Sequence, residues 1–531
     1  MDSAEDTFGI YNEHCDDPVF MDYLLNHHAE IIDEKEDLDK ILYSMEISRL
    51  LGRVAVHERC EAEREGRDRD NHKYEIYHKT ALYVARKGID IGTKHAYEVH
   101  SRGGNELDIV FNHHMGWLLA QYAMMLLETQ RYSAAMGAII NAENYLIHDY
   151  YRIANESDPK KLIEELRKIP FCKSFKFNYS AKQLKEMLPM ILNGVMQGLK
   201  DVIIEKKLRI LYKVYKEVPS KYEYLYKRFI VGHLDYFFKK DKEACVRQFG
   251  EVIMALKDDI TKTEKGLELP ELSIKNCQLE VTDEQKDYDL WVISGNLALS
   301  YLEYVPDITL RSQYVCDDLE VDFQDPEMNL MMDDVMETFE HCRFEVYLAT
   351  SYEAPIANLA YLLSPKAKRI YNQEVLLDTY PRLYSVLDKL SHIVMKSFGI
   401  TLMPSRVGEH PQPSYRRIVK TIRDNFGKNP YLLTLCEIFD EINPRVIYNK
   451  RKDLPFYTML PEAEHMDRIR HHIIHSGVAL TVEDSGMKSN CDIAYITEKE
   501  FSTRCLDLLN LVKEAIMNTA LAIEYKSKHQ V

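Results

Sequence analysis

Apolar residues recur every three or four positions through most of this chain, which is the spacing that places them on one face of a helix. The pattern predicts amphipathic helices at 74–99, 366–400 and 430–439. It is strongest at 498–526, where leucines, valine and isoleucine hold the core spacing of a helix that closes a bundle. The sequence therefore predicts an all-α protein.

A repeat of large and small residues stands out in the first half. Its two segments are Leu119-x-x-Tyr122-Ala123-x-x-Leu126 and Tyr132-x-x-Ala135-x-x-x-Ile139-x-x-Ala142. Small residues at the close crossing of two helices, flanked by large ones, are typical of tetratricopeptide (TPR) repeats. A weaker copy runs from Gly232 to Phe249. We therefore expect TPR-like helical hairpins over 74–282, and the alternative is an irregular helical domain.

The segment Asp467-Arg-Ile-Arg-His-His-Ile-Ile-His-Ser-Gly477 concentrates the chemistry of the chain. On a helix, His471 and His475 are an i, i+4 pair and share a face, whereas His472 points away from them. The long side chain of Arg470 can reach toward the pair from the adjacent face. One short helix thus offers a permanent cation and two imidazoles.

These groups suit the cleavage of RNA without a metal. Imidazole titrates near pH 6.5, so it can remove a proton from a ribose 2′-hydroxyl and return one to the leaving 5′-oxygen. A guanidinium stays charged and can hold two phosphate oxygens as charge develops. Attack by the internal 2′-hydroxyl would leave a 2′,3′-cyclic phosphate.

Two other interpretations of this histidine pair stay open at this point. His471 and His475 have the spacing of half a zinc site, although no third ligand stands nearby at a usable spacing. Histidines on an amphipathic helix also serve as ordinary interface residues. Arg468 can replace Arg470 as the cation, because its distance from His475 along the chain suits the same motif.

Arg470-His471-x-x-x-His475 resembles the Arg-polar-x(3–5)-His motif of HEPN (higher eukaryotes and prokaryotes nucleotide-binding) domains. The stretches 339–349 and 385–398 resemble the earlier helices of a HEPN branch that usually follows TPR repeats, and the resemblance covers about 290–525. The residue after the family's arginine is most often Asn. His471 in its place leaves open whether this site cleaves RNA or only binds nucleotides.

The resemblance implies a helical bundle that pairs with a second copy, and an endoribonuclease that needs neither metal nor cofactor. It assigns His475 as general base or acid, Arg470 as the group that stabilises the phosphorane, and His471 as an assistant in positioning or proton transfer. Asp388 is the acidic residue expected to reach the motif from an early helix, with a surface salt bridge as the alternative. The basic residues that we expect to guide RNA are Arg416, Arg417, Lys420, Arg423, Lys450 and Arg451.

The net charge of −17 is unevenly divided. Residues 351–531 hold 24 Lys and Arg against 21 Asp and Glu, a net +3, whereas the first 350 hold 44 against 64, a net −20. An acidic N-terminal part favours protein partners, such as an antitoxin, or self-restraint of the C-terminal site over binding of nucleic acid. The strongly acidic stretch 282–340 is expected to be a linker or a lid beside the RNA site.

At 531 residues the chain is long enough for several domains, and it has no apolar run that would span a bilayer. The acidic N-terminus lacks a signal-peptide pattern. The ten cysteines of the whole chain contain no C-x-x-C pair. These features predict a soluble cytoplasmic protein with reduced thiols.

The expected organisation is an acidic helical segment at 1–73, TPR-like repeats at 74–282, an acidic linker with entry helices at 283–340 and a HEPN bundle at 341–531. The expected function is an endoribonuclease that acts as a homodimer and is controlled by the N-terminal repeats, as in toxin or antiviral systems. The alternative is a non-catalytic scaffold whose bundle only dimerises or holds a nucleotide.

Overall fold

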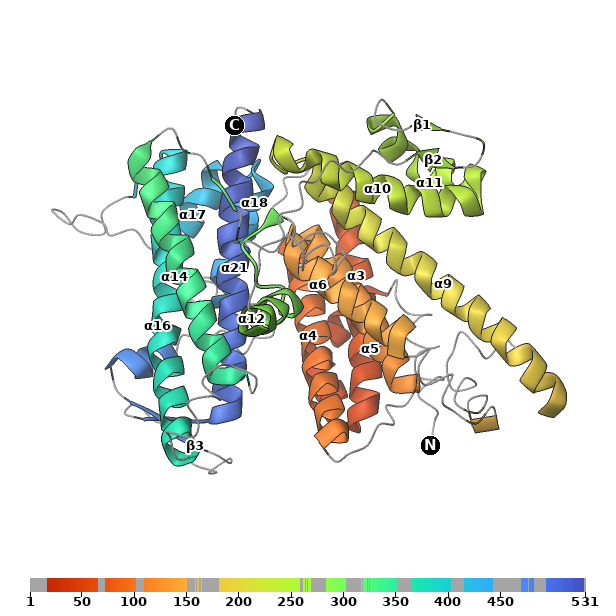
Figure 1. Ribbon diagram of the computed structural model, residues 1–531, viewed down its shortest axis with the longest axis horizontal. Coiled ribbons are helices and arrows are strands. Elements are labelled where there is room, and N and C mark those ends of the chain that lie inside the picture. The colour runs from red at the N-terminus through yellow and green to blue at the C-terminus, as the bar shows by residue number, and fades with distance from the viewer. Residues whose placement is uncertain are drawn as a thin grey trace.

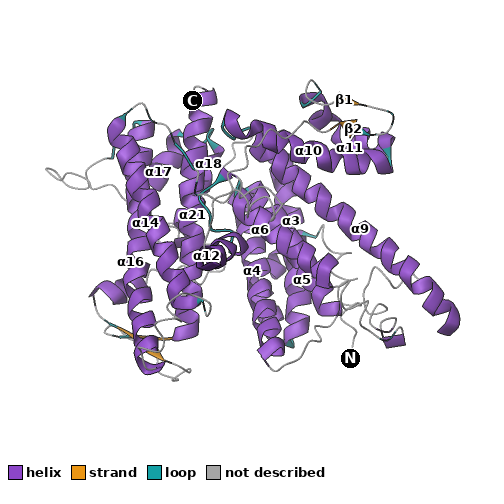
Figure 2. Ribbon diagram, viewed as in Figure 1, coloured by secondary structure: helices purple, strands orange, loops and turns teal. Residues whose placement is uncertain are grey.

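A computed structural model gives the arrangement of the chain, and helices dominate it (Figure 2). It describes residues 17–64, 72–101, 109–149, 181–257, 283–301, 325–351, 365–402, 415–442, 469–475, 477–481 and 493–529, with parts of 158–164, 261–268 and 317–323. The all-α prediction is confirmed. Among these residues no helix is both long enough and apolar enough to cross a bilayer.

The first half opens with a layer of long helices (Figure 1). They are α2 (Pro18–Asp33), α3 (Asp37–Arg64), α4 (His72–Ser101), α5 (Ile109–Glu128), α6 (Tyr132–Glu143) and the short π-helix η1 (Asn144–Asp149). The side chain of Asp17 caps α2 by accepting a hydrogen bond from the Val19 backbone N–H at 2.9 Å, and Pro18 occupies the first turn. Helix α4 matches the predicted helix at 74–99.

Three further helices and a small hairpin follow. Helix α9 (Ala181–Tyr215) extends away from the other helices in Figure 1. Its C-terminal part meets α10 (Ser220–Lys240), which is followed by α11 (Lys242–Ala255) and by the paired strands β1 (Thr261–Lys262) and β2 (Leu267–Glu268). Asp241 ends α10 and caps α11 by accepting from the Ala244 N–H at 2.9 Å.

The repeat pattern corresponds to two helical hairpins, α5 with α6 and α10 with α11. The small residues Ala123, Ala135 and Ala142 are fully buried, as the close crossing of two helices requires. Helices α3 and α4, at 28 and 30 residues, form a longer pair beside them. Helical hairpins are therefore present, while their assignment to the TPR class stays a prediction.

The second half is a helical bundle, on the left of Figure 1. Its elements are α12 (Asp283–Ser294), α14 (Pro326–Thr350), α16 (Pro365–Phe398), α17 (Tyr415–Asn425), α18 (Pro430–Ile442) and α21 (Glu498–His529). Residues 469–475 form the short helix that carries the Arg-His motif, and we call it the motif helix. Asp325 caps α14 through the Glu327 N–H at 3.0 Å, with Pro326 in the first turn.

Two short strands lie within this bundle and were not predicted. Strand β3 (Val478–Thr481) pairs in parallel with β4 (Ala494–Thr497), so the chain leaves the motif helix and enters α21 through the same small sheet. Ala494 and Ile496 are buried, whereas Tyr495 and Thr497 are partly exposed, which is the alternation of a strand with one covered face. Four residues are too few for that alternation to be visible in the sequence.

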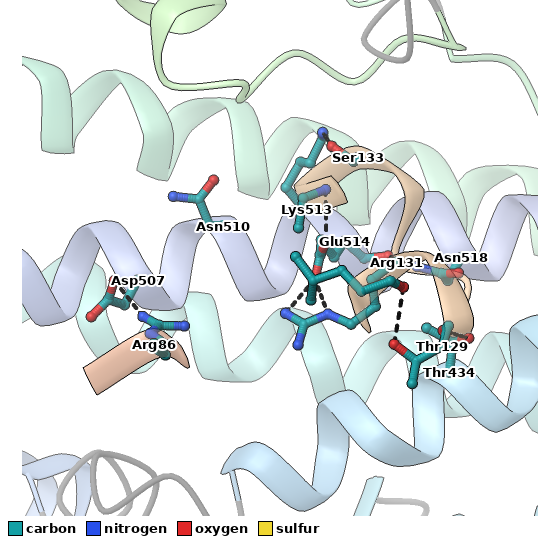
Figure 3. A network of polar contacts seen from close by, with 12 residues as sticks. Arg86, Thr129, Arg131, Ser133, Thr434, Asp507, Asn510, Lys513, Glu514 and Asn518 are labelled. Carbon is teal, nitrogen blue, oxygen red and sulfur yellow. Dashed lines mark hydrogen bonds and ion pairs between the residues drawn. The ribbon is translucent and has the colours of Figure 1, made fainter. Parts of the chain in front are cut away.

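Helix α21 lies between the two halves and packs against both. It contacts α14, α16 and α18 of the bundle, and its polar residues bond to the N-terminal helices (Figure 3). Arg131 Nε donates to Glu514 Oε2 at 2.8 Å, and the Ala134 N–H donates to Glu514 Oε1 at 3.2 Å. Lys513 donates to the Ser133 hydroxyl. The two halves therefore share one hydrophobic core.

Candidate functional site

The motif helix has one face in the core and one face in solvent. Ile469 and His472 are 2% and 3% exposed and anchor it to the bundle. His471, Ile474 and His475 are exposed. The sequence placed His472 opposite the other two histidines, and the structure does the same, so this amphipathic helix presents its imidazoles outward.

His471 and His475 lie beside each other on the exposed face. Their ring centroids are 4.9 Å apart with the planes tilted by 52°. Two neutral or singly protonated imidazoles at this separation can act on the same small substrate, one as a base and one as an acid. The i, i+4 spacing predicted that the two histidines share a face of the helix, and in the structure their rings are in contact.

Arg470 turns the other way, toward α16. Its guanidinium carbon lies 4.9 Å from the centroid of the Tyr384 ring, and its Nη2 lies 3.8 Å from Asp388 Oδ2. The second distance is short enough for an ion pair but longer than a hydrogen bond. Arg470 Nε is buried and makes no hydrogen bond within the part of the chain that the structure describes. The guanidinium is thus held over the Tyr384 ring and near Asp388, and the terminal nitrogens of this partly exposed side chain, rather than the buried Nε, are the donors that a ligand could reach.

The partners of Arg470 stand one turn apart on α16. Tyr384 and Asp388 are an i, i+4 pair, and the apolar side chains of Leu383, Leu387 and Leu390 beside them are fully buried in the bundle. A rigid helix therefore positions both groups. Sequence reasoning identified Asp388 and missed Tyr384, although the four-residue spacing from Asp388 was a signal that could have found it.

No hydrogen bond, ion pair or ring contact joins Arg470 to His471 or His475 among the described residues. Arg470 and His475 are five residues apart, so on a helix their side chains point about 140° away from each other. His471 and His475 are four residues apart, and their side chains differ in direction by about 40°. The chain thus brings together two separate sets, Arg470 with Asp388 and Tyr384, and His471 with His475.

The predicted RNA-guiding residues divide into two groups. Arg416, Arg417, Lys420 and Arg423 lie on α17, where Arg417 and Arg423 are exposed and Ile418 and Ile422 are buried. Helix α17 reaches the C-terminal end of α16, where Phe426 contacts Phe398 at 5.7 Å between ring centroids. Lys450, Arg451 and Arg468 lie outside the described residues, as does Asp467.

Asp317, in the acidic stretch, is held in a buried junction. Its Oδ1 accepts from Arg343 Nη1 at 2.7 Å and from the Leu299 N–H at 2.7 Å, and Arg343 also donates to the Tyr288 hydroxyl. Arg343 is 3% exposed, so this contact joins Asp317 to α12 and α14 in the interior. Asp317 here serves packing, and no described contact links it to Arg470.

A zinc site at the histidine pair would need further ligands. Within the described ranges, no group of three His, Cys, Asp or Glu residues is gathered closely enough to hold a metal ion. The residues that are in place instead offer proton transfer by two imidazoles and charge stabilisation by a guanidinium.

Comparison with known proteins identifies the second half. Residues 319–526 match the sequence model of the LA2681-like HEPN domains. No curated protein and no solved structure gives a match. The matched range contains α14, α16, α17, α18, the motif helix and nearly all of α21, and so includes Arg470 with its partners Tyr384 and Asp388. The chain therefore carries a HEPN domain of the LA2681-like family at residues 319–526.

Proposed function

We propose that this protein is a metal-independent endoribonuclease. HEPN domains are nucleotide-binding or ribonuclease-type domains, and the observation that favours a ribonuclease is the exposed pair His471 and His475 on the same helix as Arg470. A domain that only held a nucleotide would need cations for phosphate. Two adjacent imidazoles add the ability to move protons near neutral pH.

In the proposed reaction one imidazole takes the proton of a ribose 2′-hydroxyl, and the 2′-oxygen forms a bond to the adjacent phosphorus. The bond from phosphorus to the 5′-oxygen breaks, and an imidazolium donates its proton to that oxygen. His475 acts as the base or the acid, and His471 assists it. Arg470 stabilises the negative charge on the non-bridging oxygens. The products are a 2′,3′-cyclic phosphate and a free 5′-hydroxyl.

A homodimer fits the way the site is divided. Within one protomer, Arg470 faces α16 while the histidines face solvent, so a second motif helix placed against the exposed face would bring a second set of groups to the same cleft. Ile474 supports this arrangement, because it is 49% exposed between the two histidines and would be covered by a partner. We infer that the active cleft lies between two copies.

Helix α17 would guide the RNA strand. From Asp388 to Phe398 is ten residues of α16, or about 15 Å along the helix, and α17 approaches α16 at that end. Two or three nucleotides of a single strand span such a distance. We therefore assign Arg416, Arg417, Lys420 and Arg423 to backbone contacts beside the cleavage site, and Lys450 and Arg451 to the same role.

The N-terminal half would bind a protein. Residues 1–282 hold 41 Lys and Arg against 47 Asp and Glu, a net −6, and the stretch 283–350 that follows carries −14, so neither favours RNA and both suit a protein partner such as a sensor or an antitoxin. It packs on α21, which itself packs on α16, so a partner bound there has a continuous path of packed helices to Tyr384 and Asp388. We propose that it controls the nuclease in a toxin or antiviral role in the cytoplasm.

The second candidate is a scaffold whose HEPN domain dimerises or holds a nucleotide without cleaving RNA. Asp388 favours it, because a carboxylate 3.8 Å from Arg470 offsets part of the charge that a transition state would need. His471 in place of the family's usual Asn points in the same direction.

Cleavage of labelled total RNA and tRNA in EDTA by the full chain tests the proposal. We expect fragments ending in cyclic phosphate, and a loss of rate of about 100-fold or more in His475→Ala and Arg470→Ala. His57→Ala, which removes an exposed histidine of α3, is the matched control and should cleave normally. Absence of cleavage by the dimeric full chain, together with retained nucleotide binding, would favour the scaffold.

A further inference from the structure

A series of three aromatic rings in tilted contact lies beneath Arg470. Tyr384 is fully buried and contacts Tyr380 at 5.6 Å between ring centroids, and Tyr380 contacts Phe501 of α21 at 5.5 Å. Arg470 lies over the first ring of this series at 4.9 Å. The series is fixed by two long helices, so the ring beneath the guanidinium has little freedom to move.

A ring face and a carboxylate hold an arginine in different ways. A carboxylate at hydrogen-bond distance would engage two N–H groups and neutralise the charge. A ring attracts the cation through its quadrupole and leaves the N–H groups free at the edge of the guanidinium plane. Asp388 is too distant to take a hydrogen bond, and the Arg470 side chain is 26% exposed, so its terminal N–H groups can meet a ligand although Nε is buried.

We propose that Tyr384 is a positioning residue for the reaction, since its ring fixes the plane of the Arg470 guanidinium while leaving its donors available to the scissile phosphate. This inference rests on the proposed function and adds a residue to it. The part of Tyr384 that matters is the ring face, so the phenol hydroxyl is not required. Tyr380 belongs to the same series of rings and supports Tyr384, and the ring that lies under the cation is that of Tyr384.

Kinetics of three variants test the role of the ring. We expect Tyr384→Phe to cleave within about twofold of the native rate, and Tyr384→Met to lose about 10- to 100-fold in kcat with a smaller change in KM. Tyr226→Met removes an equally buried ring from α10, in the N-terminal half, and is the control. After correction for folded content by circular dichroism, it should retain its rate. Equal losses in Tyr226→Met and Tyr384→Met, or a loss in Tyr384→Phe, would overturn the proposal.

Fluorination tests the same point without removing the ring. 3,4,5-Trifluorophenylalanine at position 384 keeps nearly the shape of phenylalanine but weakens the negative face, so kcat should fall below that of Tyr384→Phe in a protein of unchanged melting temperature. An unchanged kcat would show that the ring only fills space.

A double-mutant cycle separates this inference from the proposed function. Tyr384→Met and Arg470→Gln, alone and together, should show coupling of roughly 2- to 30-fold in the unfolding equilibrium constant, as expected for a cation over a ring. This readout needs no cleavage. Coupling in a protein that does not cut RNA would retain the ring contact and refute the nuclease, whereas cleavage without coupling would refute the role of Tyr384.

Discussion

Two helical segments of the same HEPN domain use charged residues in opposite ways. Between 511 and 522 every residue of α21 is buried, and its Lys513 and Glu514 are bonded to partners in α6 and the α5–α6 loop. The motif helix leaves His471, Ile474 and His475 exposed and holds Arg470 by a ring and a distant carboxylate. The charged groups of α21 have hydrogen-bonded partners and contribute to stability. The guanidinium of Arg470 keeps N–H donors that could bind a substrate.

The buried location of α21 explains why its charges must be paired. An ion without a partner in the core would cost several kcal/mol, so Glu514 accepts from both Arg131 and the Ala134 backbone. Asn429 similarly donates to the Ala522 carbonyl at 3.0 Å, which joins α21 to the start of α18. These bonds fix how the N-terminal helices and the bundle meet.

Removal of Glu514 should have the largest effect on stability. Glu514→Ala leaves Arg131 buried without its carboxylate, and we expect a loss of about 3–5 kcal/mol in the free energy of unfolding. Urea denaturation measures it. The control is Asp334→Ala, which breaks the ion pair with Lys389 at a side chain that is 61% exposed and should cost less than about 1 kcal/mol. Equal losses in the two variants would refute the distinction.

Acid should destabilise the N-terminal helices next. Burial lowers the pKa of His78 and of His114 to about 4, from an ordinary value near 6.5. Because the folded pKa is the lower one, the stability is complete above pH 6.5 and is lost as the pH falls toward 4. Between pH 7.5 and 5.5 we expect a loss of about 1.3 kcal/mol for each histidine, or roughly 3 kcal/mol together.

Urea denaturation at the two pH values measures this loss. His78→Asn removes one of the buried imidazoles, so its stability should depend less on pH than that of the native chain. An identical pH dependence in the variant would show that His78 does not titrate on unfolding.

A charge in the exposed face of the motif helix should weaken the proposed dimer. Ile474→Asp places a carboxylate in the surface that a second copy would cover, and we expect at least a tenfold higher dissociation constant, or about 1.4 kcal/mol. Sedimentation or light scattering across a dilution series measures it. Met254→Asp changes a side chain of α11 that is 62% exposed and should leave association unchanged.

Arg470→Gln should have the smallest effect on stability. The side chain is partly exposed, and among the described residues its contacts are those with Asp388 and Tyr384, so we expect a loss of less than about 1 kcal/mol in the free energy of unfolding. A loss as large as that of Glu514→Ala would mean that Arg470 is a structural residue, and the contrast between the two segments would fail.

The spacing of residues along the chain predicted the helices and the faces on which side chains lie. The period of apolar residues placed the helices that became α4, α16, α18 and α21, and the i, i+4 rule predicted the common face of His471 and His475. Contacts between segments distant in sequence were harder to predict. Asp388 was found through a family resemblance, whereas Tyr384 and the Arg131–Glu514 pair depend on how helices cross. Sequence alone did not show that the acidic residue Asp317 would be bound to Arg343.

The position of α21 in the chain has a consequence for biosynthesis. This helix is made after every other element of both halves, yet it supplies the shared centre of their core. Chains begin to fold from the N-terminus as they emerge from the ribosome. The apolar surface that α21 covers is therefore exposed on the earlier helices until α21 has been synthesised. A message cut short before codon 498 would therefore yield helices whose apolar surfaces stay uncovered, and we expect such a product to aggregate or to be degraded.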